Sequence, residues 1–226
     1  MRRRLAFTVP ELLAVIAIVM IIIAMLLPAM SKAKRHAQGV VCMSNLHQLA
    51  MAHKGYANDN RQTHCHRESF LKDPPGWVGG PGYPYINGIP QDSILVKFRY
   101  LDGLDAFTCP GDDFKRQDRT DLEPYWYRYI RPATFSYTRN AEAANRSLYP
   151  STYKIRKPSQ TCLTAEESET APMNGSEFYA NNYDMMTARH DGNCGMNFFD
   201  MHAEYISTKE FNTSSASVRI DRWLNP

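Results

Sequence analysis

Residues 12–29 form the longest apolar stretch of the chain. They are almost all Leu, Ile, Val, Ala and Met, and the first charge after them is Lys32. About 20 such residues make a helix that is long enough to cross the hydrocarbon core of a bilayer. The pattern therefore predicts a transmembrane helix in this stretch.

Beyond Lys32 the apolar residues recur at steps of three and four, which is the period of an amphipathic helix. The predicted stripe consists of Ala33, Ala37, Val40 or Val41, Cys42, Leu46, Leu49, His53 and Tyr56. We expect one helix over residues 7–56, with Gly39 and Pro28 as its weak points, because proline removes a helical hydrogen bond and should kink the helix. The polar residues 56–60 predict its end.

The remainder of the chain predicts short elements between loops. A helix is expected at 93–100, with Ile94, Leu95, Phe98 and Leu101 on one face. Strands are expected just before Cys109 and at 125–130, 135–140 and 161–165, while the Pro- and Gly-rich residues 73–84 predict a loop. A strand at 195–199, a tight turn at Asp200 and Met201, and a return strand through Ile206 predict a β-hairpin. The fold class is therefore α+β, a long N-terminal helix packed on a small antiparallel sheet.

Composition and charge argue against several classes of protein. The 226 residues suffice for one domain beyond the apolar segment, and a net charge of +3 without a basic run outside the N-terminus gives no indication of nucleic-acid binding. The five cysteines contain no C-x-x-C pair, which argues against a zinc ribbon or a thioredoxin-like motif. Outside the cytoplasmic membrane disulfides become possible, and an odd count leaves at least one thiol unpaired. Alternatively, several cysteines are small buried apolar residues.

The charges that flank the apolar run predict its orientation. Arginines occupy positions 2–4, so the positive-inside rule places the N-terminus in the cytoplasm and the bulk of the chain outside. A cleaved secretory signal is an alternative, with Ser31, Ala33 and Ala37 as small residues for the cleavage site. Glu11 argues against that alternative, because an unpaired carboxylate at the head of an apolar run is costly.

Residues 6–13, Ala-Phe-Thr-Val-Pro-Glu-Leu-Leu, resemble the signature of type IV prepilins. The resemblance implies that a membrane peptidase cuts between Ala6 and Phe7, that the new Phe7 amine is methylated, and that Glu11 pairs with this amine in a neighbouring subunit. The usual Gly before the cut is Ala6 here, and Val9-Pro10 replaces the usual Leu-Ile. The chain then divides into a leader at 1–6, a transmembrane half-helix at 7–30, an amphipathic half at 31–57 and an exported α+β domain at 58–226.

Further stretches resemble a subfamily of pilin-like proteins with a C-terminal H-x9-D-G motif. They are residues 42–49, residues 56–60, the Cys-Pro-x-Asp at Cys109, and the hairpin with His190, Asp200 and His202. Met201 replaces the motif's glycine, so we expect either a strained Met201 or a different turn, because φ > 0 is cheap only for glycine. We also expect that Cys109 bridges to Cys42 or to Cys65 if one of them lies nearby.

Two further groups of residues contain the types of side chain that bind metals. His190, Asp200 and His202 have the side chains of a metal site, but a hydrogen bond between His190 and Asp200 that fixes the ends of the hairpin is the favoured hypothesis. His64, Cys65 and His66 alternate along an extended chain, so no metal ligand is assigned there. The acidic run Glu166, Glu167 and Glu169 is interpreted as a solvated loop, and no catalytic motif is present in the sequence.

The resemblance implies a structural subunit rather than an enzyme, without a cofactor. This subunit, a pseudopilin, would belong to a type IV pilus-like or type II secretion-like filament. Its expected partners are prepilin peptidase, other pilin-like subunits and the bacterial inner membrane, which it would cross once with the domain on the periplasmic side. Two alternatives stay open. One is a membrane-tethered carbohydrate- or ligand-binding module that uses Trp77 and Tyr83, and the other is a metallohydrolase that uses His190, Asp200 and His202.

Overall fold

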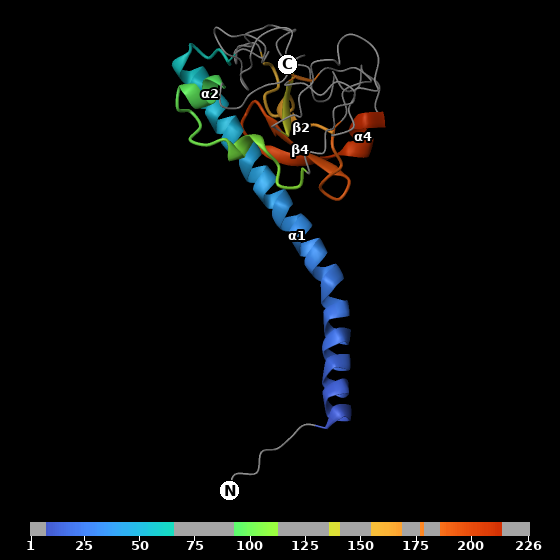
Figure 1. Ribbon diagram of the computed structural model, residues 1–226. Helices are drawn as coiled ribbons and strands as arrows, with labels where there is room; N and C mark the ends of the chain where they lie inside the picture. Colours follow the sequence, from blue (N-terminus) through green and yellow to red (C-terminus); the bar gives the residue numbers. More distant parts are fainter. Residues whose placement is uncertain are drawn as a thin grey trace, which may run out of the picture. The chain divides into compact units, whose positions relative to one another are not determined.

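The protein has an α+β architecture, as predicted (Figure 1). The computed structural model describes residues 8–65, 93–112, 136–140, 155–168, 177–178 and 186–213. The expected strand at 125–130 and the loop at 73–84 lie outside these residues. The chain forms two compact units, Met1–Ala37 and Gln38–Pro226, and the helix α1, Val9–Asp59, begins in the first and ends in the second.

In the first unit, every described residue from Thr8 to Ala37 is exposed. The exposed side chains include the large apolar residues between Val9 and Met30. The helix continues through Pro28, and the Ser31 hydroxyl donates to the Leu27 carbonyl at 3.1 Å. Within the described part of the chain, α1 is the one helix that is long and apolar enough to cross a membrane.

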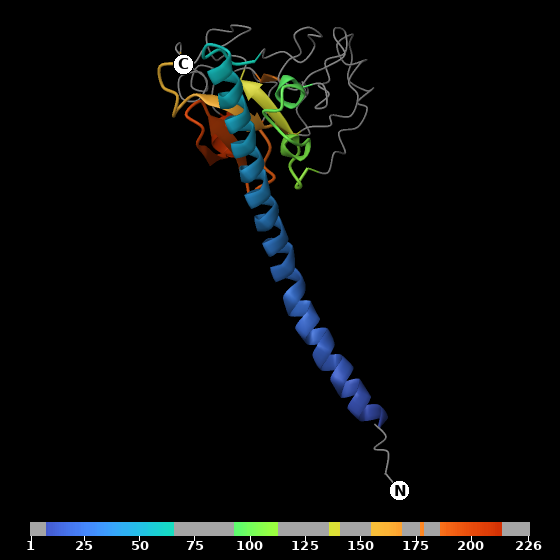
Figure 2. The same cartoon turned by 90° about the vertical axis from the view of Figure 1, so that its left-hand side faces the viewer.

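In the second unit, the later turns of α1 pack on the sheet (Figure 2). Cys42, Leu46, Leu49 and His53 are fully buried, as the predicted stripe requires. The prediction for Val40 and Val41 is wrong, because both side chains are about half exposed or more, at 59% and 47%. The position that contacts the sheet is Gly39, where an added Cβ would lie 2.6 Å from the Tyr205 Oη.

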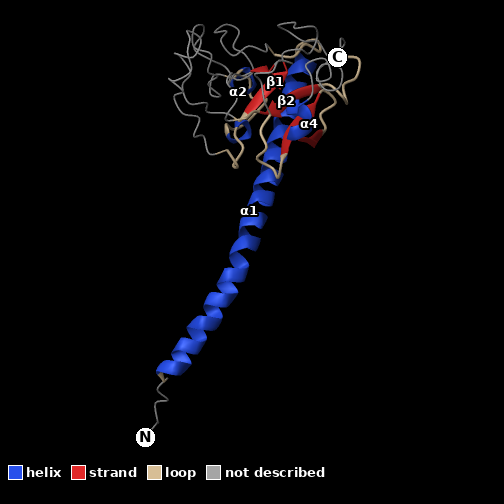
Figure 3. Ribbon diagram, turned by 90° about the vertical axis from the view of Figure 1, so that its right-hand side faces the viewer, coloured by secondary structure: helices blue, strands red, loops and turns tan. Residues whose placement is uncertain are grey.

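Within the described residues, the sheet has five strands in the order β3-β1-β2-β4-β5. They are β1 (Tyr137–Asn140), β2 (Cys162–Glu166), β3 (Glu177–Phe178), β4 (Asn193–Phe198) and β5 (Ala203–Ser207). The pairs β1/β2, β2/β4 and β4/β5 are antiparallel, whereas β3 adds in parallel to β1. The helix α4, Thr208–Thr213, follows β5 directly (Figure 3).

Two residues of β4 allow α1 to approach the sheet closely. A Cβ at Gly195 would lie 2.6 Å from the Leu46 Cδ1, so a side chain at this strand position would collide with the helix. Asn197 is fully buried, and its Nδ2 donates to the Leu46 carbonyl at 2.7 Å while its Oδ1 accepts from the Thr164 amide at 2.9 Å. This single side chain therefore links α1, β2 and β4 at an irregularity in the β2/β4 register.

The predicted hairpin is present as β4 and β5. The Met201 amide donates to the Phe198 carbonyl at 2.9 Å, and the Phe198 amide donates to the His202 carbonyl at 3.0 Å. Met201 has a φ of 80°. Of the two expectations for this position, a strained Met201 or a different turn, the first is therefore correct. A residue of positive φ after a turn is the common closure of a three-residue hairpin loop, and glycine is favoured there.

Replacing Met201 with glycine is expected to raise the free energy of unfolding by about 1 kcal/mol, because glycine removes the cost of a side chain in the left-handed region. Denaturant unfolding of the full chain in detergent micelles measures the change. The matched control is Met201→Ala, which keeps a Cβ at this φ and should bring no comparable gain. Equal gains in both variants would assign the effect to the loss of the methionine side chain instead.

Two local predictions are wrong. The helix α2, Ile94–Lys97, is shorter than expected, and Phe98 is 64% exposed, whereas Ile94, Leu95 and Leu101 are buried. Phe98 is the C-cap residue of α2, with a φ of −97°. The helix ends before Phe98 and therefore does not place it on the buried face. The segment before Cys109 is a 3-10 helix, η2 (Asp105–Phe107), rather than a strand.

Candidate functional site

The start of α1 positions the Glu11 carboxylate. Its Oε2 accepts from both the Thr8 amide and the Thr8 hydroxyl, each at 2.8 Å. The Leu12 amide donates to the Thr8 carbonyl at 3.2 Å, so Thr8 occupies the N-cap position, directly before α1 begins at Val9. A Glu three residues after a Thr at the helix start, bonded back to its amide, is half of a capping box. The acid at the head of the apolar run therefore has partners within its own chain. Ala6 and Phe7 lie outside the described residues.

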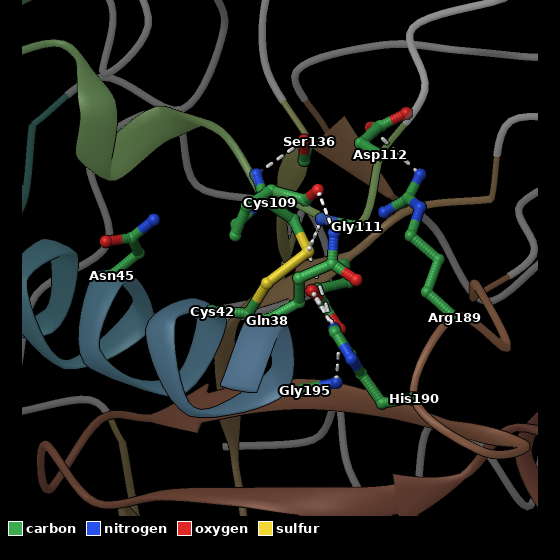
Figure 4. The surroundings of a disulfide bond; sticks show 12 residues. Gln38, Cys42, Asn45, Cys109, Gly111, Asp112, Ser136, Arg189, His190 and Gly195 are labelled. Atoms are coloured by element: carbon green, nitrogen blue, oxygen red, sulfur yellow. Dashed lines mark hydrogen bonds and ion pairs between the residues drawn. A yellow bond between two sulfur atoms is a disulfide. The ribbon is translucent and has the colours of Figure 1, made fainter. Parts of the chain in front are cut away.

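A second group of polar residues surrounds a disulfide between Cys42 and Cys109 (Figure 4). The bond joins α1 to the turn after η2, across 67 positions of the sequence, and Cys65 remains a thiol. Hydrogen bonds from α1 flank it on both sides. The Gln38 Nε2 donates to the Pro110 carbonyl and the Asn45 Nδ2 donates to the Thr108 carbonyl, both at 2.7 Å. We call this region the disulfide junction.

His190 and Glu166 meet beside the disulfide. The His190 Nε2 lies 2.9 Å from the Glu166 Oε1 and 3.5 Å from the Cys109 Sγ, and the two side chains are 6% and 0% exposed. The other carboxylate oxygen, Oε2, accepts from the Gly195 amide at 2.8 Å. This pair connects the end of β2 to the loop before β4. His190 and Glu166 can exchange a proton with each other. Together with Cys109 they place a nitrogen, an oxygen and a sulfur atom close to one another.

Glu166 and Glu167 were predicted to be solvated, and that prediction is wrong. Both are buried, at 0% and 1% exposure, because β2 lies between β1 and β4 and its end is covered by other elements. A second buried ion pair lies next to them. The Arg189 Nη2 contacts the Asp112 Oδ2 at 3.0 Å and also donates to the Glu167 carbonyl at 2.9 Å. Sequence reasoning missed Glu166, Asp112 and Arg189, since no local pattern distinguishes a buried charge from a solvated one.

The expected hydrogen bond between His190 and Asp200 does not form. His190 precedes β4 and Asp200 follows it, so the two residues lie at opposite ends of a six-residue strand, about 20 Å apart at ~3.3 Å per residue. Asp200 contacts its neighbour instead, with its Oδ1 at 2.5 Å from the His202 Nδ1. The three residues of the proposed metallohydrolase site therefore do not converge.

A third cluster contains His53, His64, Cys65 and Arg139. The Arg139 Nη1 donates to the Cys65 carbonyl at 2.7 Å, and the Cys65 Sγ lies 3.3 Å from the His53 Nδ1. Burial, reinforced by the charge of Arg139, lowers the pKa of His64 to about 3 and that of His53 well below its usual value. Burial also raises the pKa of the Cys65 thiol to about 11. A neutral pair of histidines next to a guanidinium is a poor environment for a metal cation, and His66 lies outside the described residues.

Comparison of the chain with protein-family models, with curated proteins and with solved structures finds no match. The fold itself is compatible with that of the pilin-like proteins, since a long apolar N-terminal helix continues onto a small, largely antiparallel sheet. Trp77 and Tyr83, on which the ligand-binding alternative depends, lie outside the described residues.

Proposed function

We propose that this protein is a structural subunit of a type IV pilus-like or type II secretion-like filament. In this proposal prepilin peptidase cuts between Ala6 and Phe7, the apolar part of α1 holds the subunit in the inner membrane, and the unit from Gln38 onward stays on the periplasmic side. The subunit then enters the filament through the same apolar helix, next to other pilin-like subunits. The protein has no catalytic task in this proposal.

The observation that carries the proposal is the exposed apolar segment with a single acid at its head. Every side chain of α1 between Val9 and Ala37 is exposed, and Glu11 is the one acidic residue of that segment. A bilayer covers such a surface in the free subunit, and neighbouring helices cover it in a filament. A helix that serves only as a membrane anchor does not require a carboxylate at this depth, because an ionised group there costs several kcal/mol unless it is paired.

Glu11 has two alternative sets of partners in this mechanism. In the single chain its carboxylate accepts from the Thr8 amide and hydroxyl, which keeps it hydrogen-bonded while the subunit lies in the membrane. In the filament the positively charged amine at Phe7 of a neighbour would add an ionic partner, and a hydrogen bond between two ionised groups is stronger than the bonds from the neutral Thr8 donors that it supplements. The gain in free energy would occur only on assembly, so the carboxylate would favour the assembled state.

The test separates the charge of Glu11 from its capping role. Glu11→Gln keeps the capping box, since glutamine also serves at this position, but removes the charge. Thr8→Ala removes the hydroxyl that donates to Glu11 and leaves the charge and the Thr8 amide bond in place. We expect Glu11→Gln to reduce incorporation into sheared filaments or secretion complexes at least tenfold, and Thr8→Ala to have a much smaller effect. Normal incorporation of the Glu11→Gln chain would contradict the proposed role of the acid.

Processing is tested separately by intact mass and N-terminal fragment analysis of the protein from its native membrane. The expected chain begins at an N-methylated Phe7. A chain that begins after Ser31 would show that the apolar segment is a cleaved signal, and the filament proposal would then fail together with the anchor.

A further inference from the structure

We propose that the disulfide junction is a zinc site when Cys42 and Cys109 are reduced. The disulfide and the metal are then alternative ways to hold the same segments together. Among the residues that the structure describes, Cys42, Cys109, Glu166 and His190 bring one ligand atom each to within 4.8 Å of the others. The proposal concerns this group alone and does not depend on the filament function.

The four side chains have the chemistry of a closed zinc site. Zinc prefers two to four cysteine or histidine ligands in a tetrahedron and also accepts carboxylate oxygen. In a tetrahedron with metal–ligand bonds of about 2.0–2.3 Å, the ligand atoms lie roughly 3.3–3.8 Å apart. The His190 Nε2 already lies 3.5 Å from the Cys109 Sγ and 2.9 Å from the Glu166 Oε1, so shifts of about half an ångström suffice there. The two sulfurs must separate further, by rotation of their side chains once the bond between them is absent.

The surroundings hold the nitrogen and oxygen ligands in place. The Gly195 amide donates to the Glu166 Oε2 at 2.8 Å, which leaves Oε1, the oxygen that faces His190, as the ligand atom of the carboxylate. The Nε2 of His190 lies close to both Glu166 and Cys109, so the ring presents one nitrogen to the group. Figure 4 shows His190 beside the disulfide. The Gly111 amide lies 3.4 Å from the Cys109 Sγ and donates toward it, an interaction that suits a thiolate. Hydrogen bonds of this kind around the ligands raise metal affinity.

The elements that meet at this group come from four parts of the chain. Cys42 lies in α1, Cys109 in the turn after η2, Glu166 at the end of β2 and His190 before β4. A structural metal contributes directly to folding when it joins distant segments. A newly synthesised chain contains thiols until an oxidant acts on it, because the cytoplasm is reducing. Zinc would therefore stabilise the reduced chain at the place where the disulfide stabilises the oxidised one.

The two states interconvert with a balanced exchange. On metal binding, two thiol protons leave, the two thiolates, the neutral His190 and the Glu166 carboxylate bind Zn2+, and any proton shared by His190 and Glu166 is also released. On oxidation, the two thiolates lose two electrons to the disulfide of a thiol–disulfide oxidant, which takes up two protons from water and becomes a dithiol, and Zn2+ is released. Reduction by a dithiol reverses the step.

The test uses the full chain in detergent micelles, with cobalt(II) and zinc(II) as the probes. After anaerobic reduction and removal of the reductant, one equivalent of Co2+ is expected to give thiolate-to-cobalt absorption and tetrahedral d–d bands, which Zn2+ then displaces. The oxidised chain should give neither. Absence of the thiolate band in the reduced wild-type chain overturns the proposal, as does a reduced chain whose far-UV circular dichroism is lost and is not restored by Zn2+.

The location of the metal is tested by alkylation and by variants. One equivalent of Zn2+ should slow the alkylation of Cys42 and Cys109 at least tenfold more than that of Cys65, whose buried thiol responds only to the stability of the fold. Glu166→Gln keeps the size of the side chain and should weaken metal binding at least tenfold, whereas Cys65→Ala should leave it unchanged. Protection of Cys65, Cys162 or Cys194 in place of Cys42 and Cys109 would assign the metal to another site and overturn the proposal.

Discussion

Replacing Cys42 and Cys109 together with alanine is expected to lower the free energy of unfolding by about 4 kcal/mol. The bond spans 67 positions of the sequence, and the entropy that a cross-link of this span removes from the unfolded chain corresponds to about 4 kcal/mol at 25 °C. For a domain of ordinary stability, this is a large part of the total. The variant is therefore expected to unfold at a clearly lower denaturant concentration than the oxidised wild type.

Denaturant unfolding of the full chain in micelles measures this effect, in a buffer with a metal chelator so that zinc cannot replace the disulfide. The same comparison after reduction is the control. Reduction should destabilise the wild type by about the same amount and leave the Cys42→Ala/Cys109→Ala chain unchanged. If the oxidised wild type and the double variant differ by less than about 1 kcal/mol, other contacts restrict the unfolded chain even without the disulfide.

Acidification from pH 6.5 to pH 5 is expected to destabilise the protein by about 3 kcal/mol through two buried histidines. Burial lowers the pKa of His64 to about 3 in the folded chain and that of His53 well below its usual value. In the unfolded chain both regain a pKa near 6.5. Below pH 6.5 the unfolded state binds protons that the folded state does not bind. Above pH 6.5 the two histidines therefore do not lower the free energy of unfolding. As the pH falls below 6.5, it decreases by about 1.4 kcal/mol per pH unit for each histidine.

The pH dependence of unfolding in wild type and two variants tests this account. His64→Gln should reduce the slope between pH 6.5 and pH 5 by about half. His47→Gln is the matched control, since His47 lies on the exposed face of α1, the helix that carries His53, and should leave the slope unchanged. A wild-type stability that is flat over this range would mean that the two histidines are charged in the folded protein or stay neutral in the unfolded one.

Sequence patterns predicted the parts of this fold that local periodicity determines. The apolar run, the helix that follows it, the strands at β1 and β2, and the β4/β5 hairpin are each visible in the spacing of side chains over a few residues. Even the difficulty at Met201 was predictable, because the position needs a positive φ that only glycine adopts easily.

The Cys42–Cys109 bond is one of the two bridges expected for Cys109, but the polar residues of the disulfide junction could not be predicted in the same way. Glu166 and Glu167 look solvated in the sequence, and only the packing of β2 between two strands shows that they are buried. The partner of His190 lies 24 positions earlier in the chain, not at Asp200 within its own hairpin. The face of α1 near Val40 was misassigned because the helix contacts the sheet through Gly39, a residue that no hydrophobic pattern marks.

The position of the Cys42–Cys109 bond also has a mechanical consequence. Tension applied between the start of α1 and the C-terminus would pass through the covalent cross-link, so the 67 sequence positions between the two cysteines would carry no load. At ~3.4 Å per residue this hides about 230 Å of contour length from extension. The oxidised chain would therefore behave as a short tether under force, and reduction of one bond would convert it into a much longer one.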